Sequence, residues 1–455
     1  MSTPPLASGP QGLGALRPLL DTVLDALDEG RRARGGPMPA GGPDAVAARL
    51  AAAAGDVLPD HGDPDALRTL VRALAEGAAD PAEPLCVAHL HCPPLAVATA
   101  ADLAASVLNP SLDSWDQAPA ASALEGLVTR ALAAEVHPGR QGGDALVTTG
   151  GTEANQLALL LAREALGGVR LVCGANAHHS LTRAAWLLGL PDPVVVPAPA
   201  GTLDPAALDD ALKSVTGPHL VAATAGTTDA GLIDPLGEIA AVCSAHGARL
   251  HIDAAYGGPL LFSDRRRFLL DGLDAAHTVT LDLHKLGWQP VAVGLLAVRE
   301  PGDLTALHQQ ADYLNADDDT EAGLPDLLGR SLRTTRRPDI LKVAVTLRTL
   351  GRSGLGALVD QVCDRAQEFA GLVAAHPAFE LYDRPTISTV LFRPAHVTDE
   401  AVAAVRRRLL TDGRAVLGRA RADGRVWLKA TLLNPHTRPD DLAALLRTVE
   451  GHTAP

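Results

Sequence analysis

Lysine is scarce in this chain of 455 residues, although positive charge is not. Lys and Arg together number 39, yet only four of these residues are lysines: Lys213, Lys285, Lys342 and Lys429. Arginine can replace lysine in most surface roles, but its guanidinium group stays protonated and cannot serve as a free amine. A lysine retained in such a chain is therefore a candidate for amine chemistry, and the search is confined to four positions.

Cysteine is also rare, and its spacing is not that of a site. The number of cysteines is odd, they are scattered along the chain, and none belongs to a C-x-x-C motif. This pattern argues against a disulfide framework and against a zinc site, so we expect no bound metal ion. The five residues are Cys86, Cys92, Cys173, Cys243 and Cys363.

An excess of positive charge and a long apolar run are missing as well. The net charge of −14 argues against a nucleic-acid partner, because phosphate binding needs a basic surface. The sequence contains no run of about 18 apolar residues, so it predicts no membrane-spanning helix. The first residues, MSTPPLASGPQG, lack the charged start and apolar core of a signal peptide. We therefore expect a cytoplasmic protein that binds neither membranes nor nucleic acids.

The middle of the chain alternates short apolar runs with helical patterns. Runs such as ALVTT, HLVAATAG and HTVTLDLH are typical of buried strands. This alternation predicts an α/β fold, with a mostly parallel sheet covered by helices on both faces. We expect a helical N-terminal segment over 1–95, a large α/β domain over 96–345 and a small α+β domain over 346–455. The last part should contain helices over 355–375, 398–411 and 438–449, and strands near 378–382, 386–393 and 425–431.

Two glycines follow the first of these strands. The segment TTGGTEAN places Gly150 and Gly151 between the strand and a helix expected over 153–166. Backbone N–H groups at a helix start, together with the helix dipole, favour an anion. Gly151 and Thr152 are therefore candidates for an anion cradle. In the alternative interpretation, the Thr152 hydroxyl only caps the helix.

A carboxylate stands at the end of another strand. In HIDAAYGG, Asp253 follows an apolar run and precedes small residues such as Ala255, which would let a flat ligand lie close to the backbone. Ligands of open parallel sheets bind at the carboxyl ends of the strands. Asp253 could there hold a heteroaromatic N–H⁺. The alternative is a helix cap or a structural ion pair.

Two further strand ends carry a lysine and a histidine. In DLHK, Lys285 follows the strand TVTL and stands next to His284. Burial lowers the pKa of a lysine and makes it a nucleophilic amine, whereas an ordinary surface lysine is the alternative. In AHHS, His178 could stack on an aromatic cofactor or be purely structural. His178 and its neighbour His179 are not expected to bind one metal ion together.

Taken in order, these motifs resemble the group II PLP-dependent amino acid decarboxylases, which share the aspartate-aminotransferase-type fold. The resemblance runs from about residue 85 to 450. It implies a seven-stranded, mostly parallel sheet, pyridoxal 5′-phosphate (PLP) as cofactor, and decarboxylation of an amino acid to its amine. Two departures blur the subfamily: Leu286 stands where Trp usually follows the lysine, and Glu153-Ala154 stands where a subgroup has Gln-Ser. The matching segments are TTGGTEAN, AHHS, ATAGTTDAGLIDPL, HIDAAYGG, DLHK and LNPHT.

The same resemblance implies a role for each site residue. Lys285 would bind PLP as an imine, and Asp253 would pair with the protonated pyridine nitrogen. His178 would stack on the ring and help to orient the substrate carboxylate, while Asp234 would be structural. The implied cofactor-binding residues are Gly151, Thr152, His178, Thr228, Asp253, Ala255, His284 and Lys285.

Tyr313 lies 28 residues after Lys285, in a stretch rich in Asp and Gly. In relatives the corresponding loop carries a tyrosine that donates a proton to the substrate carbon and reaches across a dimer interface. The resemblance therefore implies that Tyr313 is catalytic, with Lys285 and His178. It also implies a homodimer with shared active sites, in which the loop 109–120 comes from the neighbouring subunit. The alternative for Tyr313 is a packed aromatic residue in an ordered loop.

Two segments near residue 100 bear on the substrate. HLHCPP (89–94) and LDSWDQAP (112–119) resemble the L-2,4-diaminobutyrate and lysine decarboxylases of siderophore pathways. Where relatives acting on aromatic amino acids carry large aromatics, this chain has His91, Cys92 and Asp113. A carboxylate accepts an ammonium group that an apolar pocket rejects. We therefore predict that His91 and Asp113 bind a diamino acid, either 2,4-diaminobutyrate, ornithine or lysine. Alternatively, Asp113 caps a turn.

Three other functions remain open at this point. The chain could decarboxylate an aromatic or acidic amino acid, such as tyrosine, glutamate or aspartate. It could be a decarboxylating aldehyde synthase, although a tyrosine at position 313, rather than phenylalanine, argues against that. It could also be a catalytically silent binding protein with a PLP fold, which the joint presence of Lys285, Asp253, His178 and Thr152 argues against.

Overall fold

The computed structural model describes residues 4–139, 143–309 and 311–453. Contacts between Cα atoms divide the chain into two compact units. The terminal unit combines Met1–Pro93 with Arg365–Arg384 and Thr389–Pro455, and the central unit combines Pro94–Asp364 with Pro385–Ser388. The division into segments 1–95, 96–345 and 346–455 is a division along the chain, and it stays a prediction.

The central unit is built on a seven-stranded sheet with the strand order β1-β7-β6-β5-β4-β2-β3. Neighbours from β6 to β3 pair in parallel, whereas β7 is antiparallel to both β1 and β6. This architecture confirms the predicted fold class. The strands are β1 (Asp144–Thr148), β2 (Arg170–Gly174), β3 (Val194–Val196), β4 (His219–Thr224), β5 (Arg249–Ala254), β6 (Thr278–Asp282) and β7 (Gly294–Val298).

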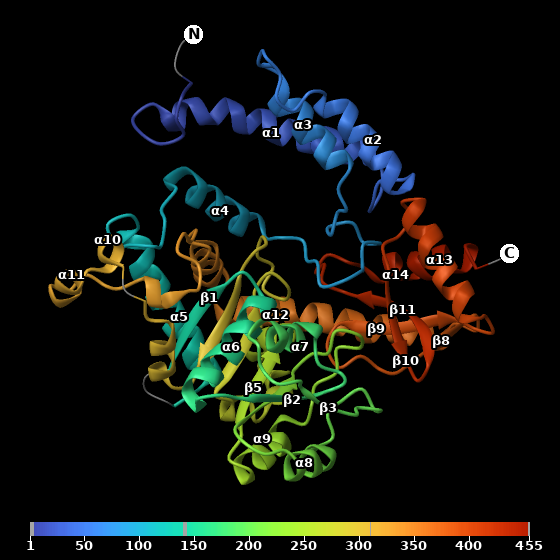
Figure 1. Ribbon diagram of the computed structural model, residues 1–455. Helices are drawn as coiled ribbons and strands as arrows, with labels where there is room; N and C mark the ends of the chain where they lie inside the picture. The colour runs from blue at the N-terminus through green and yellow to red at the C-terminus, as the bar shows by residue number, and fades with distance from the viewer. Residues whose placement is uncertain (1–3, 140–142, 310, 454–455) are drawn as a thin grey trace. The chain divides into compact units, whose positions relative to one another are not determined.

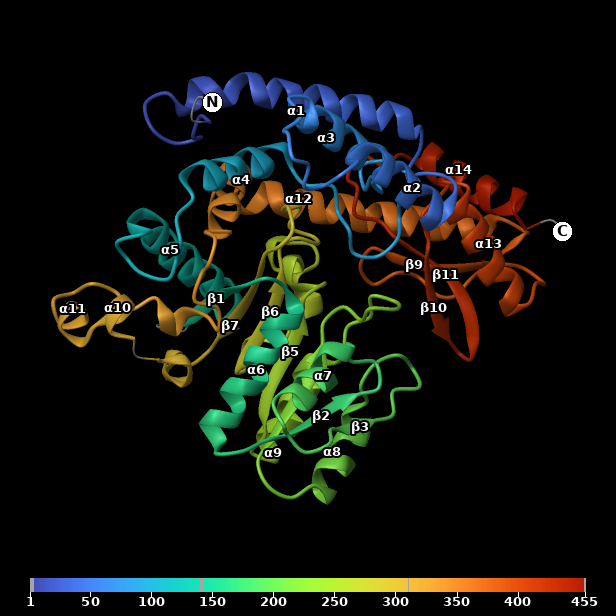
Figure 2. The ribbon, with the colours of Figure 1, turned by 45° about the horizontal axis from the view of Figure 1, so that its top comes forward.

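Burial explains why these strands are apolar along their whole length. Every residue of β4, β6 and β7 is buried, which is typical of a parallel sheet covered on both faces. The helix α6 (Gly151–Leu166) contacts β5, β6 and β7, and Figures 1 and 2 both show it lying over one face of the sheet. Two other helices also pack on the sheet, α5 (Pro119–Val136) against β1 and β7, and α9 (Leu236–Ala245) against β4 and β5.

The remaining helices of the central unit connect or flank the strands. The longest helix, α12 (Ile340–Ala375), passes from the central into the terminal unit and is kinked at Gly351, whose φ of 64° suits a glycine. The others are α4 (Ala96–Leu108), α7 (His179–Leu187), α8 (Pro205–Ser214), α10 (Asp312–Asn315) and α11 (Asp317–Glu321), with 3₁₀ turns η1 (Gly258–Phe262), η2 (Arg267–Leu270), η3 (Leu273–Ala275), η4 (Pro301–Leu307) and η5 (Leu328–Arg330).

The terminal unit contains a four-stranded antiparallel sheet with the order β10-β11-β9-β8. One cluster of buried apolar side chains forms its core, including Phe369, Phe392, Val405 and Leu445. Its strands are β8 (Phe379–Leu381), β9 (Thr389–Pro394), β10 (Gly418–Ala422) and β11 (Arg425–Thr431), and its helices are α1 (Gly12–Arg34), α2 (Gly42–Ala54), α3 (Ala66–Glu76), α13 (Asp399–Thr411) and α14 (Pro439–Gly451).

Across the described ranges, no helix has both the length and the apolar character that crossing a bilayer requires.

Candidate active site

The register of the sheet brings the predicted strand-end residues to one edge. Thr148, the last residue of β1, pairs with Gly294, and Gly294 pairs with Asp282, the last residue of β6. On the other side of β6, Asp253 near the end of β5 pairs with Thr280. The carboxyl ends of β1, β5 and β6 therefore lie side by side, at the edge where open parallel sheets bind ligands.

Gly150 and Gly151 form a close-packed turn at this edge. Gly150 has a φ of +150°, and a Cβ atom there would lie 3.0 Å from Cε1 of His284. A Cβ on Gly151 would lie 3.0 Å from the Cβ of Ala255 and 3.2 Å from Oδ2 of Asp282. Glycine therefore suits both positions, and the turn places the first backbone amides of α6 at the carboxyl ends of the strands, where a helix start favours an anion.

The start of α6 also decides how Thr152 is used. The helix begins at Gly151, and its N-cap is Gly150, which has no side chain. The alternative in which the Thr152 hydroxyl caps the helix is therefore wrong, and Thr152 is exposed. Next to it, Glu153 accepts hydrogen bonds from the backbone N–H and the hydroxyl of Thr149, at 2.6 and 2.8 Å, and it pairs with Arg333 at 3.1 Å.

Lys285 forms an ion pair with a buried carboxylate. Its Nζ lies 2.8 Å from Oδ2 of Asp282, whose side chain is 2% exposed, while the lysine side chain is 18% exposed. Within the described residues, Oδ1 of Asp282 is buried and accepts no hydrogen bond. Burying a carboxylate is costly unless a charge pairs with it, so Asp282 holds the ammonium group of Lys285 at the sheet edge.

His284 is oriented by the backbone of the segment before β7. Its Nδ1 lies 2.8 Å from the carbonyl oxygen of Val293 and donates to it, because a carbonyl can only accept. Its Nε2 lies 3.8 Å from Oδ2 of Asp282. His284 thus stands next to Gly150 and to the Lys285–Asp282 pair, beside the proposed phosphate cradle.

Asp253 is buried and held through both carboxylate oxygens. Oδ1 accepts the backbone N–H of Ala255 at 3.1 Å, and Oδ2 accepts Nδ2 of Asn155 at 2.8 Å. Asn155 comes from the second turn of α6, whose apolar face covers the sheet. The carboxylate is therefore fixed from two elements, as a partner for a cationic group must be.

His178 lies within the electrostatic reach of these groups. Burial lowers the pKa of the His178 imidazole, and the positive charge of Lys285 acts in the same direction, while Asp253 and Asp282 act against it. The ring centroid of His178 lies 4.1 Å from that of His179. His178, Asp253, Asp282 and Lys285 consequently form one electrostatic cluster at the edge of the sheet.

The turn after β4 contributes one buried carboxylate and one exposed hydroxyl. Asp234 accepts hydrogen bonds from Asn176, Leu203 and Thr224, at 2.7–2.8 Å. Burial raises the pKa of Asp234, and these hydrogen bonds act against the rise. The three bonds support the structural role predicted for it, and Thr228 lies exposed on the same turn.

The predicted substrate residues belong to different parts of the chain. Asp113 follows Leu112, which is anchored by a 2.8 Å hydrogen bond from its N–H to the carbonyl of Arg336. Nη1 of Arg336 in turn donates to both carboxylate oxygens of the buried Glu125 of α5, at 2.9 and 3.0 Å. Within the described residues, Oδ1 of Asp113 is buried and has no hydrogen-bond partner.

Tyr313 and His91 are placed differently from the edge residues. The Tyr313 side chain is 82% exposed and lines a surface cavity of about 530 Å³ with Arg163, Glu164 and Arg333. His91 belongs to the terminal unit, where burial lowers its pKa against the opposing charge of Asp80. Their roles in binding and catalysis stay predictions.

The sequence analysis did not identify two residues of the site, Asn155 and Asp282. Both lay inside the motifs TTGGTEAN and DLHK. The signal for Asn155 was an amide on the otherwise apolar, sheet-facing side of a helix, and the signal for Asp282 was a carboxylate three residues before the lysine. Within the described residues, no group of three His, Cys, Asp or Glu side chains could hold a metal ion.

These residues fit PLP. The glycine turn presents the amides of a helix start, which favour a phosphate, and Lys285 is the single lysine of this cluster, held at a ligand-binding sheet edge. The buried carboxylate of Asp253 provides the partner that a protonated pyridine nitrogen needs. Fold and site together define a PLP-dependent enzyme of the aspartate-aminotransferase-type fold.

The chain belongs to the pyridoxal-dependent decarboxylase family, whose conserved-domain model matches residues 56–395. It is 41% identical over 421 residues to an L-2,4-diaminobutyrate decarboxylase from Rhizobium meliloti, covering 88% of this chain and 84% of that protein. A second L-2,4-diaminobutyrate decarboxylase, from Acinetobacter baumannii, is 34% identical over 407 residues, covering 80% and 79%.

A solved structure agrees with these relatives. It is the glutamate decarboxylase domain of the diaminobutyrate-pyruvate transaminase and L-2,4-diaminobutyrate decarboxylase from Vibrio parahaemolyticus. The two chains share a TM-score of 0.87 at 30% identity, over 99% of this chain and 97% of that one. The chain is thus a PLP-dependent amino acid decarboxylase, which confirms the predicted family, cofactor and reaction.

Proposed function

We propose that this enzyme decarboxylates a diamino acid, with 2,4-diaminobutyrate as the first candidate and ornithine and lysine as the others. We also propose that it acts in the cytoplasm as a homodimer with shared active sites. The names of the two bacterial relatives support the first candidate. None of the five cysteines forms a disulfide and all are buried, which suits a reducing compartment.

One observation carries the choice of a diamino acid. Oδ1 of Asp113 is buried and has no hydrogen-bond partner among the described residues. Leaving a buried carboxylate oxygen without a donor costs about 1–3 kcal/mol or more, which a bound ammonium group would offset. An acidic side chain would add repulsion, an apolar one would leave this cost in place, and a phenol could give only a neutral hydrogen bond, which is weaker than one from an ammonium group. Asp113 therefore favours a substrate with a second amine.

The cofactor would be held by the residues of the sheet edge. Lys285 would attach it covalently, and Asp282 could take the ammonium proton that Lys285 loses in becoming a nucleophile. Gly151, Thr152 and His284 would surround the phosphate, and Ala255 and Thr228 would lie near the ring. Bound PLP supplies an electron sink for the pair left on Cα when CO₂ departs.

Three side chains would act on protons and on orientation. Asp253 would keep the pyridine nitrogen protonated, since both of its oxygens are already fixed by Ala255 and Asn155. His178 would lie against the ring and orient the substrate carboxylate. The phenol of Tyr313 would donate a proton to Cα after CO₂ leaves.

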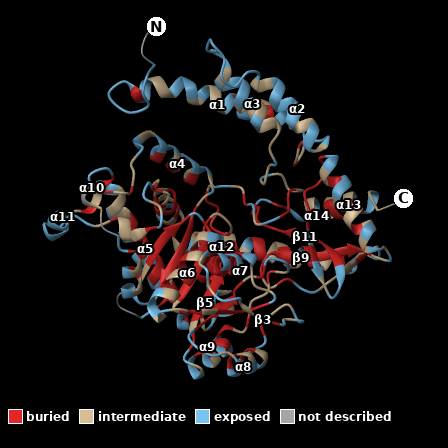
Figure 3. Ribbon diagram, in the orientation of Figure 1, coloured by how far each residue is buried: buried red, intermediate tan, exposed pale blue. Residues whose placement is uncertain are grey.

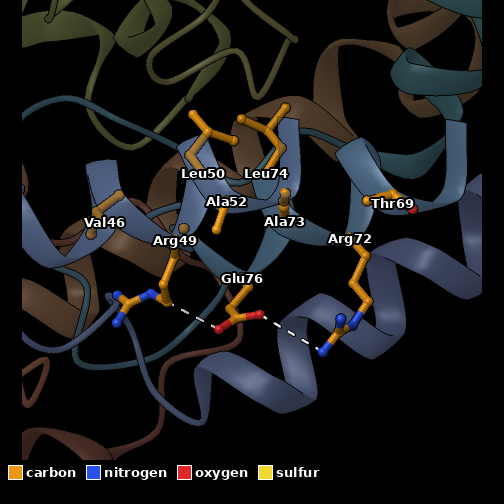
Figure 4. Close-up of a pocket in the computed structure, with 11 residues that line it drawn as sticks. Val46, Arg49, Leu50, Ala52, Thr69, Arg72, Ala73, Leu74 and Glu76 are labelled. Carbon is orange, nitrogen blue, oxygen red and sulfur yellow. Dashed lines mark ion pairs between the residues drawn. The ribbon is translucent and has the colours of Figure 1, made fainter. Parts of the chain in front are cut away.

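The homodimer is supported by an apolar surface on the terminal unit. Leu13 and Leu24 of α1 and Leu74 of α3 are 61–65% exposed, and Figure 3 shows most of α1–α3 in the colours of exposed or intermediate residues. Between α2 and α3 lies a pocket of about 280 Å³, lined by side chains such as Leu50 and Leu74 (Figure 4). Exposed apolar side chains gathered on neighbouring helices favour an interaction site, and a second copy of the chain would cover it.

A product screen tests the proposed substrate. The purified enzyme with PLP is incubated with 2,4-diaminobutyrate, ornithine, lysine, tyrosine, glutamate and aspartate, and both amine and CO₂ are measured. We expect the highest kcat/KM for one of the three diamino acids. A preference for tyrosine, glutamate or aspartate would contradict the diamino acid proposal and leave the decarboxylase intact.

Sedimentation velocity tests the dimer and its surface. We expect a dimer at micromolar concentration for the wild type and a monomer for a variant carrying Leu24→Glu and Leu74→Glu, because both charges would be buried in the interface. Leu187→Glu, at an exposed leucine of α7, is the matched control and should stay dimeric. A fully active wild-type monomer at nanomolar concentration would overturn the proposal of shared sites.

A further inference from the structure

A buried amide links the two residues proposed to contact the cofactor ring. We propose that Asn155 and Ser180 are positioning residues: the Asn155 amide holds the Asp253 carboxylate and, through the Ser180 hydroxyl, keeps His178 in the tautomer that carries its proton on Nε2. The catalytic effect of these hydrogen bonds rests on the proposed roles of Asp253 and His178, but the hydrogen bonds themselves do not depend on those roles.

Asn155 uses its full hydrogen-bonding capacity in this network. Its Nδ2 donates to Oδ2 of Asp253 and to Oγ of Ser180, both at 2.8 Å. Its Oδ1 accepts from the hydroxyl of Thr280 at 2.8 Å and from Nε2 of His251 at 3.0 Å. Since a carboxylate can only accept, the amide nitrogen must face Asp253, and the orientation of the amide is fixed.

The far side of the amide is held by a neutral histidine. His251 is completely buried, and burial lowers its pKa to about 4, with the charge of Asp253 acting against the shift. A neutral imidazole has one donor, which must be Nε2–H because Oδ1 of Asn155 accepts there. Its Nδ1 lies 2.9 Å from the hydroxyl oxygen of Thr278. Rotating the amide would break four bonds in a buried site.

The hydrogen bonds of Ser180 in turn fix the tautomer of His178. Because Ser180 Oγ accepts from Asn155, its own hydrogen is free to point at Nδ1 of His178, 2.8 Å away. The backbone N–H of Ser180 lies 3.3 Å from the same Nδ1. With two donors directed at Nδ1, that nitrogen is the acceptor of the neutral ring, and Nε2–H is the one donor left for a ligand.

The charges around His178 do not reverse this assignment. Asp253 and Asp282 favour the protonated ring, and Lys285 and His179 oppose it, but burial is the largest effect and lowers the pKa. Protonating Nδ1 would also place it against the Ser180 donors. The imidazole is therefore neutral near pH 7, and its Nε2–H suits a hydrogen bond to the substrate carboxylate.

Ser180→Ala tests this relay because it removes the hydroxyl and leaves the Asn155–Asp253 bond in place. Histidine C2 hydrogen–deuterium exchange, read by mass spectrometry, reports the pKa of each histidine in the PLP-free protein. We expect the pKa of His178 to rise by about one unit in Ser180→Ala, the equivalent of one lost hydrogen bond. Ser180→Thr, which keeps a hydroxyl, should restore the wild-type value, and Thr182→Ala, on the same helix, should leave it unchanged.

A second readout separates positioning from a general loss of structure. In the PLP-loaded enzyme, the acid limb of the pH profile of kcat/KM should move upward by about the same unit in Ser180→Ala, whereas mere loosening would lower the rate at every pH. An unchanged pKa of His178 in Ser180→Ala would overturn the proposal. Because that pKa is measured without cofactor, it is independent of whether the wild type turns over a diamino acid.

Discussion

The carboxyl edge of the large sheet and the segments around Asp113 and Tyr313 differ in how many of their polar groups have a hydrogen-bond or ion-pair partner. At the edge, Asp253 has two hydrogen-bond donors, Lys285 has a carboxylate, and Asn155 uses all four of its bonding positions. By contrast, a buried oxygen of Asp113 has no donor among the described residues, and Tyr313 is 82% exposed.

This difference separates two parts of the site. The strand ends that carry Asp253 and Asp282 and precede Gly150 and Lys285 are brought together within one chain by strand register. The part that would recognise the substrate and donate a proton is unfinished in one chain. We infer that a substrate amine and a neighbouring subunit complete it. The following substitutions probe the two parts, beginning with the largest expected effect.

Lys285→Ala should abolish turnover. It should also abolish the absorbance near 420 nm that borohydride bleaches, because within the cluster at the sheet edge Lys285 is the single amine. After borohydride reduction of the wild type, peptide mass spectrometry should find the phosphopyridoxyl group on Lys285. Lys213→Ala, at an exposed lysine paired with Asp209, is the matched control and should behave as wild type. A phosphopyridoxyl group on another lysine would refute the assignment.

Asp253→Asn should retain some PLP but lose several orders of magnitude in kcat. A neutral amide cannot hold the proton on the pyridine nitrogen, although it can still accept the hydrogen bond from Asn155. Steady-state kinetics at saturating PLP measure the loss, with Asp253→Glu as the variant that keeps the charge. Near-normal kcat in Asp253→Asn would show that another group tunes the cofactor.

Tyr313→Phe should slow amine release by about 10²–10⁴-fold, the range typical for loss of a general acid. The side chain is exposed in one chain, so the substitution should leave the stability of the fold unchanged. Tyr382→Phe, in the terminal unit, serves as the control for loss of a phenol. If amine release from Tyr313→Phe kept the wild-type rate, the alternative of a residue without catalytic function would hold.

Asp113→Asn should reduce kcat/KM for diamino acids by about 10- to 150-fold, the equivalent of one charge-assisted hydrogen bond. Slow activity on a neutral amino acid of similar length should survive, because only the charge is lost. Asp116→Asn, in the same loop, is the matched control. Equal losses on charged and neutral substrates would assign Asp113 to shaping the loop.

Much of the fold could be predicted from the sequence because buried strands and amphipathic helices have distinct periodicities. The runs ALVTT, HLVAATAG and HTVTLDLH form β1, β4 and β6, and the large sheet has the seven strands that the resemblance implied. Their antiparallel member, β7, was not recognised as such, since a buried strand is equally apolar in either direction. The strand β10 was missed because only two of its five residues, Gly418 and Ala420, are buried. The element α12 (Ile340–Ala375) consists of two helices that meet at Gly351, whose φ of 64° and ψ of 179° are not helical, and the expected helix over 355–375 falls in the second of them.

A site residue could be predicted where its motif indicates its chemistry. It could not be predicted where it interacts with residues that come close only in the folded chain. Lys285 and Asp253 end strands, which the sequence shows directly. Asn155 is recognised as a site residue through its hydrogen bonds to Asp253, which lies 98 residues away in the chain, and to Ser180, which lies 25 away. No local pattern encodes such a distance, because strand order and register determine it.

Subunit complementation tests the division between the two parts most directly. Lys285→Ala and Tyr313→Phe proteins are mixed, dissociated and reassociated, and decarboxylation of the preferred diamino acid is measured. If each site combines Lys285 of one subunit with Tyr313 of the other, half of the dimers are hybrids with one intact site, and about a quarter of the wild-type activity returns. Activity that stays at the mean of the two parent variants would show that both residues serve the site of their own chain, and would contradict the account.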